Sequence, residues 1–246
     1  MKILCFVLFS ILINTAKPAE ILIAKKEIPI LSYHNIFEKD EKSGPYFIST
    51  EVLESQLRKL KESGYQSVLP EDIYSYYVVG KALPEKCVMF SFDDNRLDHY
   101  TLAAPLLEKY GYKGAFFIMT VTIGKKNYMK ASNIKDLARR GHCIGHHTYD
   151  HQNLKKLPEK EWKKQIEDPK KKLEEIIGMN VCYLAYPFGL CNEYAAAELQ
   201  KRGIYASFQL SGKRSDNVPH QFIRRLLVPG NWSAERLSKE MASTFK

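Results

Sequence analysis

The sequence has no apolar run long enough to cross a membrane easily. Its longest, ILCFVLFSILI at 3–13, has eleven residues, whereas a membrane-spanning helix needs about 20. No glycine- or serine-rich linker, internal repeat or low-complexity tract divides the 246 residues, so one domain is the simplest reading. With 45% hydrophobic and 26% charged residues, the composition is globular, which excludes a disordered chain and a membrane bundle.

Several functional patterns are also missing. No GxGxxG motif follows the first strand-like segment, which removes the most obvious reason to expect a dinucleotide-binding fold. Lysine-rich segments such as 159–175 lack the aromatic interleaving typical of nucleic-acid sites, so we expect no nucleic-acid partner. No CxxC pair occurs among the cysteines after the N-terminal run, and we assign them no chemistry: Cys87, Cys143, Cys182 and Cys191.

The N-terminus has the form of an export signal. Lys2 precedes the apolar run, and small residues follow it near Ala16–Ala19. We interpret 1–19 as a signal peptide or an N-terminal membrane anchor, and 20–246 as the functional domain of an exported protein. Such a protein is periplasmic, held at the cell surface or secreted. No cysteine directly follows the run, which argues against a lipoprotein anchor.

The chain is basic. Its formal net charge is +9. Removal of residues 1–19 lowers it to +7, because this segment contains Lys2 and Lys17 and no acidic residue. A basic exported protein could associate with the membrane surface or with anionic envelope polymers. We expect it to be a monomer.

Strand-like and helix-like segments alternate from residue 28 onward. Amphipathic segments predict helices, such as 50–64 with Thr50 as its N-cap and 159–178 with a bend or break at Pro169. Strand-like segments that are apolar along their whole length indicate a parallel sheet covered by helices. The strand-like segments, several of them of this kind, lie at 28–36, 65–69, 87–94, 113–119, 142–148, 182–189, 205–210 and 222–228. We therefore predict an α/β fold, a distorted (β/α) barrel of about seven to eight strands in a single domain.

Unusual polar residues come at the ends of four of these strands. In a (β/α) barrel the carboxyl ends of all strands open onto one face, and that face holds the active site. An ordinary capping turn is the simpler interpretation of a carboxylate pair taken alone. The four positions together predict a shared site: His34, Asp93–Asp94, His147–His151 and Tyr186–Pro187.

His147 and His151 have a spacing that suits a metal ion. On a helical turn, residues four apart lie on one side, close enough for both imidazoles to bind one ion. A histidine pair by itself is more often surface polarity. Together with a carboxylate from 93–94 it would form a two-histidine, one-carboxylate site with positions open for water and substrate. The other carboxylate could then act as general base toward a water activated by the metal.

The other histidines have weaker claims to function. His34 is either a core histidine bonded to a backbone carbonyl or, at the rim of a metal hydrolase, a general acid that protonates a leaving group. We interpret His99, His142 and His220 as structural or solvated.

The motifs SFDD, HTYDH and YPFG, in this order, resemble those of the polysaccharide deacetylases, the NodB-homology group also called carbohydrate esterase family four. The resemblance implies that Asp93 is the base. It also implies that Asp94, His147 and His151 bind a divalent ion, zinc in most of the family, with cobalt and nickel as alternatives.

The N-terminal motif ILSYHNI narrows the resemblance. The family's usual acid is a histidine in an L-x-H motif near the C-terminus, but no histidine follows His220 here. The motif instead resembles a circularly permuted branch, the deacetylases of poly-β-1,6-N-acetylglucosamine, in which a Y-H motif near the start supplies the acid. That resemblance implies that His34 is the acid.

Two departures from the family pattern stand out. Asn95 follows the carboxylate pair where the family has glycine, which could alter the turn. The family's R-x-P-x-G motif reads AYPFG at 185–189, so the arginine that orients the base is missing, and Arg224 or Arg225 could replace it. The resemblance further implies that the amide N–H of Tyr186 helps to hold the oxyanion.

The expected function is that of an exported metal-dependent hydrolase. It would remove N-acetyl groups from an N-acetylglucosamine-containing polysaccharide similar to poly-β-1,6-N-acetylglucosamine. Peptidoglycan, chitin oligosaccharides and acetyl-xylan are alternative substrates within the family. An inactive glycan-binding relative is a further alternative, but a pure binder needs no base, metal ligands and acid, and this chain retains all of them.

Overall fold

The computed structural model describes residues 26–38, 44–210, 212–215 and 217–245. The predicted export signal at 1–19 lies outside these residues. Within the described ranges, no helix combines the length and apolar character needed to span a bilayer.

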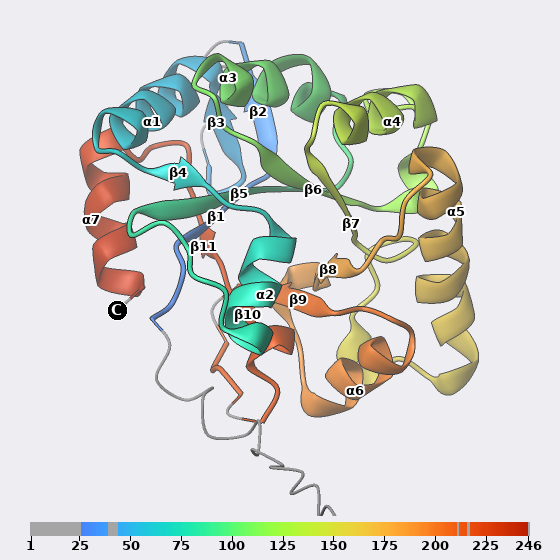
Figure 1. The fold of residues 1–246 in the computed structure, drawn as a ribbon. Coiled ribbons are helices and arrows are strands. Elements are labelled where there is room, and N and C mark those ends of the chain that lie inside the picture. The colour runs from blue at the N-terminus through green and yellow to red at the C-terminus, as the bar shows by residue number, and fades with distance from the viewer. Residues whose placement is uncertain (1–25, 39–43, 211, 216, 246) are drawn as a thin grey trace, which may run out of the picture.

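Parallel strands form a nearly closed barrel (Figure 1). The strand order is β10-β9-β8-β7-β6-β5-β1-β11, with β4 paired to β5 and a separate small sheet of β2 and β3. The bounds are β1 Ile30–Tyr33, β2 Asn35–Phe37, β3 Phe47–Ser49, β4 Gln66–Ser67, β5 Cys87–Asp93, β6 Gly114–Ile118, β7 Cys143–His146, β8 Tyr183–Ala185, β9 Ala206–Gln209, β10 Ile223–Arg224 and β11 Leu226–Leu227. The predicted (β/α) barrel in a single domain is confirmed.

One short segment joins the two edges of the sheet. β10 pairs with β9, and β11 pairs with β1, although only Arg225 separates the two strands in the chain. Its backbone N–H donates to Gln209 O at 3.1 Å. The segment that closes the barrel therefore places one residue, Arg225, between its first and last strands.

Most of the helices surround the barrel, and α2 covers one of its ends (Figure 1). The bounds are α1 Thr50–Glu62, α2 Pro70–Val79, α3 Ala104–Lys109, α4 Ala131–Arg139, α5 Asp168–Ile177, α6 Glu193–Lys201 and α7 Ala234–Thr244. Ile73 and Tyr77 of α2 pack against interior residues such as Met89 and Phe117. Helix α2 thus closes the barrel at the amino ends of the strands, and the face at their carboxyl ends stays open.

One predicted helix boundary was wrong. Ser49, not Thr50, caps α1: its backbone is extended and its Oγ accepts the Val52 N–H at 3.3 Å, whereas Thr50 is already helical. At Pro169 the predicted helix changes its hydrogen-bond pattern, as expected: the π-helical segment Lys163–Glu167 runs directly into α5, and Pro169 lies in the first turn after the change.

Alternation along β5 directs its last residue into the barrel. Phe90 and Phe92 pack between the sheet and the outer helices, whereas Met89 belongs to the barrel interior. Because successive side chains of a strand point to opposite faces, Asp93 shares the inward face with Met89. A buried carboxylate is thus delivered to the open end of the barrel.

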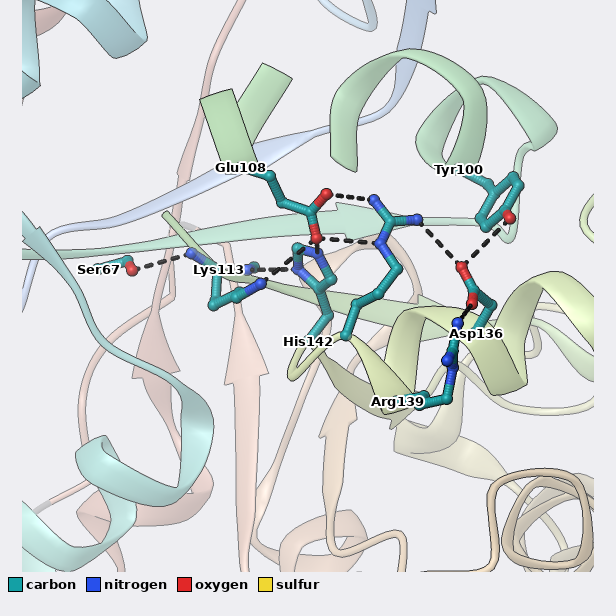
Figure 2. Close-up of polar contacts among 9 residues, drawn as sticks. Ser67, Tyr100, Glu108, Lys113, Asp136, Arg139 and His142 are labelled. Carbon is teal, nitrogen blue, oxygen red and sulfur yellow. Dashed lines mark hydrogen bonds and ion pairs between the residues drawn. The ribbon is translucent and has the colours of Figure 1, made fainter. Parts of the chain in front are cut away.

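A charged cluster ties the amino ends of β6 and β7 to the helices. Figure 2 shows Glu108 in contact with Lys113 and His142. His142 Nε2–H donates to Glu108 Oε1 at 3.1 Å, while its Nδ1 accepts the Gly114 N–H at 3.1 Å, which sets the neutral tautomer. Burial lowers the pKa of His142 to about 4. His142 is therefore structural, as predicted.

Candidate active site

The strand-end residues meet in one cavity of about 480 Å³. His34 follows β1, Asp93 ends β5, and further residues follow β7 and β8. Parallel strands bring these carboxyl ends to the same face, as the sequence predicted. The polar and aromatic residues that line the cavity are His34, Asn35, Tyr46, Phe47, Asp93, Asp94, His147, His151, Tyr186, Phe188 and Arg225.

Asp94, His147 and His151 form a compact group of side chains of the types that hold metal ions. Their ligand atoms all lie within 4.8 Å of one another. Asp94 Oδ1 lies 3.5 Å from His147 Nε2 and 3.8 Å from His151 Nε2. His147 Nδ1–H donates to Ala185 O at 2.7 Å, which leaves Nε2 unprotonated in the neutral ring and turned toward Asp94. The arrangement suits a divalent cation better than a simple ion pair.

The segment that carries the two histidines is a turn, not a helix. Thr148 and His151 have φ values of 63° and 69°, in the left-handed region that an α-helix excludes. Thr148 Oγ1 accepts the His151 N–H at 2.9 Å and stabilises this shape. The expected helical turn was therefore wrong, although the two rings still meet, with centroids 4.8 Å apart.

Arg225 holds Asp93 through both carboxylate oxygens. Nη1 lies 2.8 Å from Oδ1 and Nη2 lies 2.8 Å from Oδ2, and both side chains are buried. Burial alone would raise the pKa of Asp93, but the charges and hydrogen bonds of Arg225, with a contribution from His147, hold it well below the usual range. Asp93 thus faces Arg225 while Asp94 faces the histidines, so the structure separates the two carboxylates.

Arg225, and not Arg224, replaces the arginine that is missing at position 185. Neighbouring residues of an extended strand point to opposite sides. Arg224 accordingly leaves the barrel and pairs with Glu27, with Nε 2.8 Å from Oε1. The sequence left this choice open, and barrel closure decides it.

His34 faces the other side of Asp93. Its Nε2 lies 3.9 Å from Asp93 Oδ2, and its ring meets Tyr46 edge-on at 5.0 Å. Burial lowers the pKa of His34, and the charges of Asp93 and Asp94 oppose that shift. The alternative interpretation, in which the His34 ring is bonded to a backbone carbonyl in the core, does not match the structure. The ring points into the cavity, and it is the backbone carbonyl of His34 that accepts a hydrogen bond, from His99 Nε2.

The expected main-chain role of Tyr186 is at odds with the structure. Its N–H donates to Phe208 O at 2.9 Å, because the ladder between β8 and β9 extends one residue beyond β8. Phe188, two residues on, lines the cavity with a φ of 60°. Among the described residues, its N–H forms no backbone hydrogen bond outside its own short helical turn. Sequence reasoning missed Phe188, although it stands between Pro187 and Gly189 of the motif.

Asn95 preserves the turn that follows the carboxylate pair. Asp94 and Asn95 have φ values of 80° and 62°, a conformation that asparagine and aspartate adopt more readily than most residues other than glycine. The Asn95 side chain donates from Nδ2 to Thr122 Oγ1 at 3.0 Å, and the Asn95 backbone carbonyl accepts the Met129 N–H at 3.0 Å. Replacement of glycine by asparagine is therefore accommodated.

Comparisons with known proteins agree with this geometry. A family model described as polysaccharide deacetylase matches residues 80–207. YxkH of Bacillus subtilis, a protein assigned to the polysaccharide deacetylases, is 31% identical over 191 residues, which are 78% of this chain and 64% of that relative. The chain thus spans slightly less than two thirds of that relative's length.

Two further comparisons bear on the branch and the fold. The poly-β-1,6-N-acetyl-D-glucosamine N-deacetylase of Staphylococcus aureus is 26% identical over 207 residues, covering 78% of this chain and 71% of that protein. The structure of the Streptococcus pyogenes deacetylase PplD in complex with acetate matches with a TM-score of 0.80 at 24% identity, over 87% of this chain and 98% of that one. The latter likeness supports the barrel fold.

Proposed function

We propose that this chain, which belongs to the polysaccharide deacetylase family, is a metal-dependent hydrolase that removes N-acetyl groups from an N-acetylglucosamine-containing polysaccharide. The observation that carries the proposal is the pairing of an arginine-held carboxylate, Asp93, with a separate carboxylate–histidine group in one cavity. The relative from Staphylococcus aureus favours a polymer similar to poly-β-1,6-N-acetylglucosamine. Peptidoglycan, chitin oligosaccharides and acetyl-xylan are the alternatives.

Asp94, His147 and His151 would hold the divalent ion. One carboxylate and two imidazoles suit Zn²⁺, and Co²⁺ or Ni²⁺ as well, and three protein ligands leave coordination positions open. The fixed His147 tautomer, with Nε2 turned inward, fits this role. When bound, such an ion polarises the acetyl carbonyl and lowers the pKa of a water molecule.

Asp93 would take the proton from the attacking water. Its lowered pKa keeps the carboxylate ionised at any physiological pH, and the two contacts with Arg225 fix its orientation. His34 would then protonate the departing amine, without which the tetrahedral intermediate expels water again. The negative charge of Asp93, 3.9 Å away, stabilises the protonated His34 ring.

The main-chain N–H of Phe188 is our candidate donor to the developing oxyanion, in place of Tyr186. Phe188 lines the cavity beside His151, with ring centroids 4.4 Å apart. A donor directed at the position where negative charge develops lowers the barrier to acyl transfer. Its left-handed backbone, rare for a bulky residue, is typical of the strain found at functional sites.

We further propose that the protein is exported to the periplasm, the cell surface or the medium. The proposal rests on the signal-like residues 1–19. A polysaccharide substrate of the cell envelope agrees with that location.

Acetate release from a panel of acetylated glycans, with and without chelator, tests the function. Asp93→Asn should keep the metal and lose about 10²–10⁴-fold in kcat, the range for a missing general base. Asp136→Asn makes the same chemical change in the cluster of Figure 2, far from the cavity, and should keep full activity. Loss of metal in Asp93→Asn would mean that the two carboxylates have the opposite roles. Glycan binding without acetate release from the metal-loaded protein would favour an inactive binder.

A further inference from the structure

The catalytic cavity adjoins a second cavity of about 620 Å³. Phe188 and Gly189 line both, so they form the ridge between the two. Gly189 has a φ of +67°, and a Cβ there would lie 2.5 Å from Leu210 Cβ, so the ridge is tightly packed. The Phe188 ring on it is 60% exposed. A polymer whose reacting unit occupies the catalytic cavity can cross this ridge and place its next units in the second cavity.

The second cavity is rich in positive charge. Lys155, Lys213 and Arg214 line it, against one described carboxylate, Glu193. Lys155 and Lys213 are exposed and have no ion-pair partner among the residues that the structure describes. Asp216 belongs to the same segment but lies outside the described residues, and even with it the cations outnumber the carboxylates.

The positive charge of Arg214 is only partly compensated within the protein. Its Nε lies 3.7 Å from Glu27 Oε1, but Arg224 binds the same carboxylate through both oxygens. Two guanidinium groups therefore share one carboxylate, and one positive charge remains uncompensated.

The wall that carries these cations is braced by a buried side chain. Gln209 is fully buried at the end of β9, and its Nε2 donates to Lys213 O at 2.9 Å and to Phe222 O at 2.8 Å. A Cβ on Gly212 would lie 2.0 Å from Gln209 Oε1, so the chain passes directly over this amide. Lys213 therefore lies on a wall held in place by Gln209 beside the active site, and not on a solvated helix face.

We propose that this second cavity is a subsite for an anionic unit of the substrate, so that the preferred polymer is an acidic N-acetylated glycan, carrying carboxylate or phosphate groups next to the reacting unit. The inference rests on the proposed deacetylase function. Uncompensated cations favour such groups and repel the ammonium groups of a glycan that is already deacetylated. This favours a glycan with free carboxylate or phosphate substituents over neutral poly-N-acetylglucosamine, the polymer toward which the relative from Staphylococcus aureus points.

Two hexasaccharides of the same β-1,4 backbone test the inference. One contains only N-acetylglucosamine, and in the other alternate units are N-acetylmuramic acid, which adds carboxylates. At low ionic strength the wild type should have the lower KM for the acidic hexamer, and added salt should remove the difference. The double variant Lys155→Gln/Lys213→Gln should raise that KM about two- to fivefold for each lysine replaced. Its kcat and its KM for the neutral hexamer should not change.

A matched control is Lys135→Gln/Lys239→Gln, which removes two exposed charges from α4 and α7 and should leave both KM values as they are. Binding of each hexamer to metal-loaded Asp93→Asn, measured by calorimetry, gives a readout that needs no turnover. Equal affinity for both hexamers, or an equal effect of the lysine changes on both, overturns the inference and leaves the deacetylase proposal intact. Absence of acetate release from either hexamer counts against the deacetylase proposal, and the calorimetry then decides the inference alone.

Discussion

Replacement of Arg225 by methionine should destabilise the protein and disable its base together. Arg225 and Asp93 are both almost fully buried and bind each other through two hydrogen bonds. Removal of one partner of a buried ion pair leaves the other charge without compensation, which costs about 3–5 kcal/mol. We expect Arg225→Met to lower the free energy of unfolding at pH 7 by about this amount, as measured by urea denaturation.

The same change should move the pH dependence of activity. Burial raises the pKa of Asp93 and Arg225 is the main group that lowers it, so in Arg225→Met the carboxyl should stay protonated to higher pH. The acid limb of kcat/KM should therefore shift to higher pH. In the wild type, Asp93 contributes stability that is present above its unfolded pKa of about 3.9 and is lost as the pH falls toward its lower folded value. The stability difference between wild type and variant should accordingly narrow toward pH 3.

A double-mutant cycle separates the pair from general damage to the core. Asp93→Asn leaves Arg225 unpaired, so the double variant should lose much less stability than the sum of the two single variants. Arg224→Met is the matched control, because Arg224 is partly exposed and Glu27 keeps Arg214 nearby. Additive losses of stability, together with an unchanged pH profile in Arg225→Met, would refute the assignment of Arg225 as the residue that positions the base.

Three further predictions concern histidines with different roles. His147→Ala should abolish stoichiometric binding of one divalent ion, and metal analysis that finds the same content as in the wild type would contradict the ligand assignment. His34→Ala should keep the metal and the fold but lose most amide hydrolysis, while an activated ester, whose leaving group needs less protonation, should suffer less; an unchanged amide-to-ester ratio would make His34 structural. His142 is held neutral with a pKa of about 4, so the stability it contributes is complete above pH 6.5 and falls by up to about 3 kcal/mol as the pH drops to 4. His142→Gln should remove this part of the slope in denaturant titrations at several pH values, and a slope equal to that of the wild type would count against it.

The alternation of apolar and amphipathic segments was enough to predict the barrel, and with it the face on which the site lies. Parallel strands must open their carboxyl ends to one side, so His34, Asp93 and His147 could be placed together without coordinates. Residue types and spacing also indicated a metal site, because the relevant groups lie within short, continuous motifs.

Backbone details within the motifs could not be predicted in the same way. The turn from His147 to His151 depends on two residues in the left-handed region, which a side-chain spacing does not reveal. The hydrogen bond from the Tyr186 N–H to Phe208 O depends on how far the pairing between β8 and β9 extends. Such hydrogen bonds join segments that are distant in sequence, so only the folded chain determines which groups remain free.

The choice between Arg224 and Arg225 shows most clearly what the sequence predicts and what only the tertiary structure decides. Adjacent residues of a strand point to opposite sides, so local sequence requires only that one of the two enters the barrel. Which one enters depends on the pairing of β10 with β9 and of β11 with β1 across the closing segment. A shift of that register by one residue would exchange the two sides, and Arg224 would then face Asp93. The family resemblance of the sequence therefore indicated only that an arginine should accompany the base and offered two candidates, and barrel closure determined that Arg225 is the one that contacts Asp93.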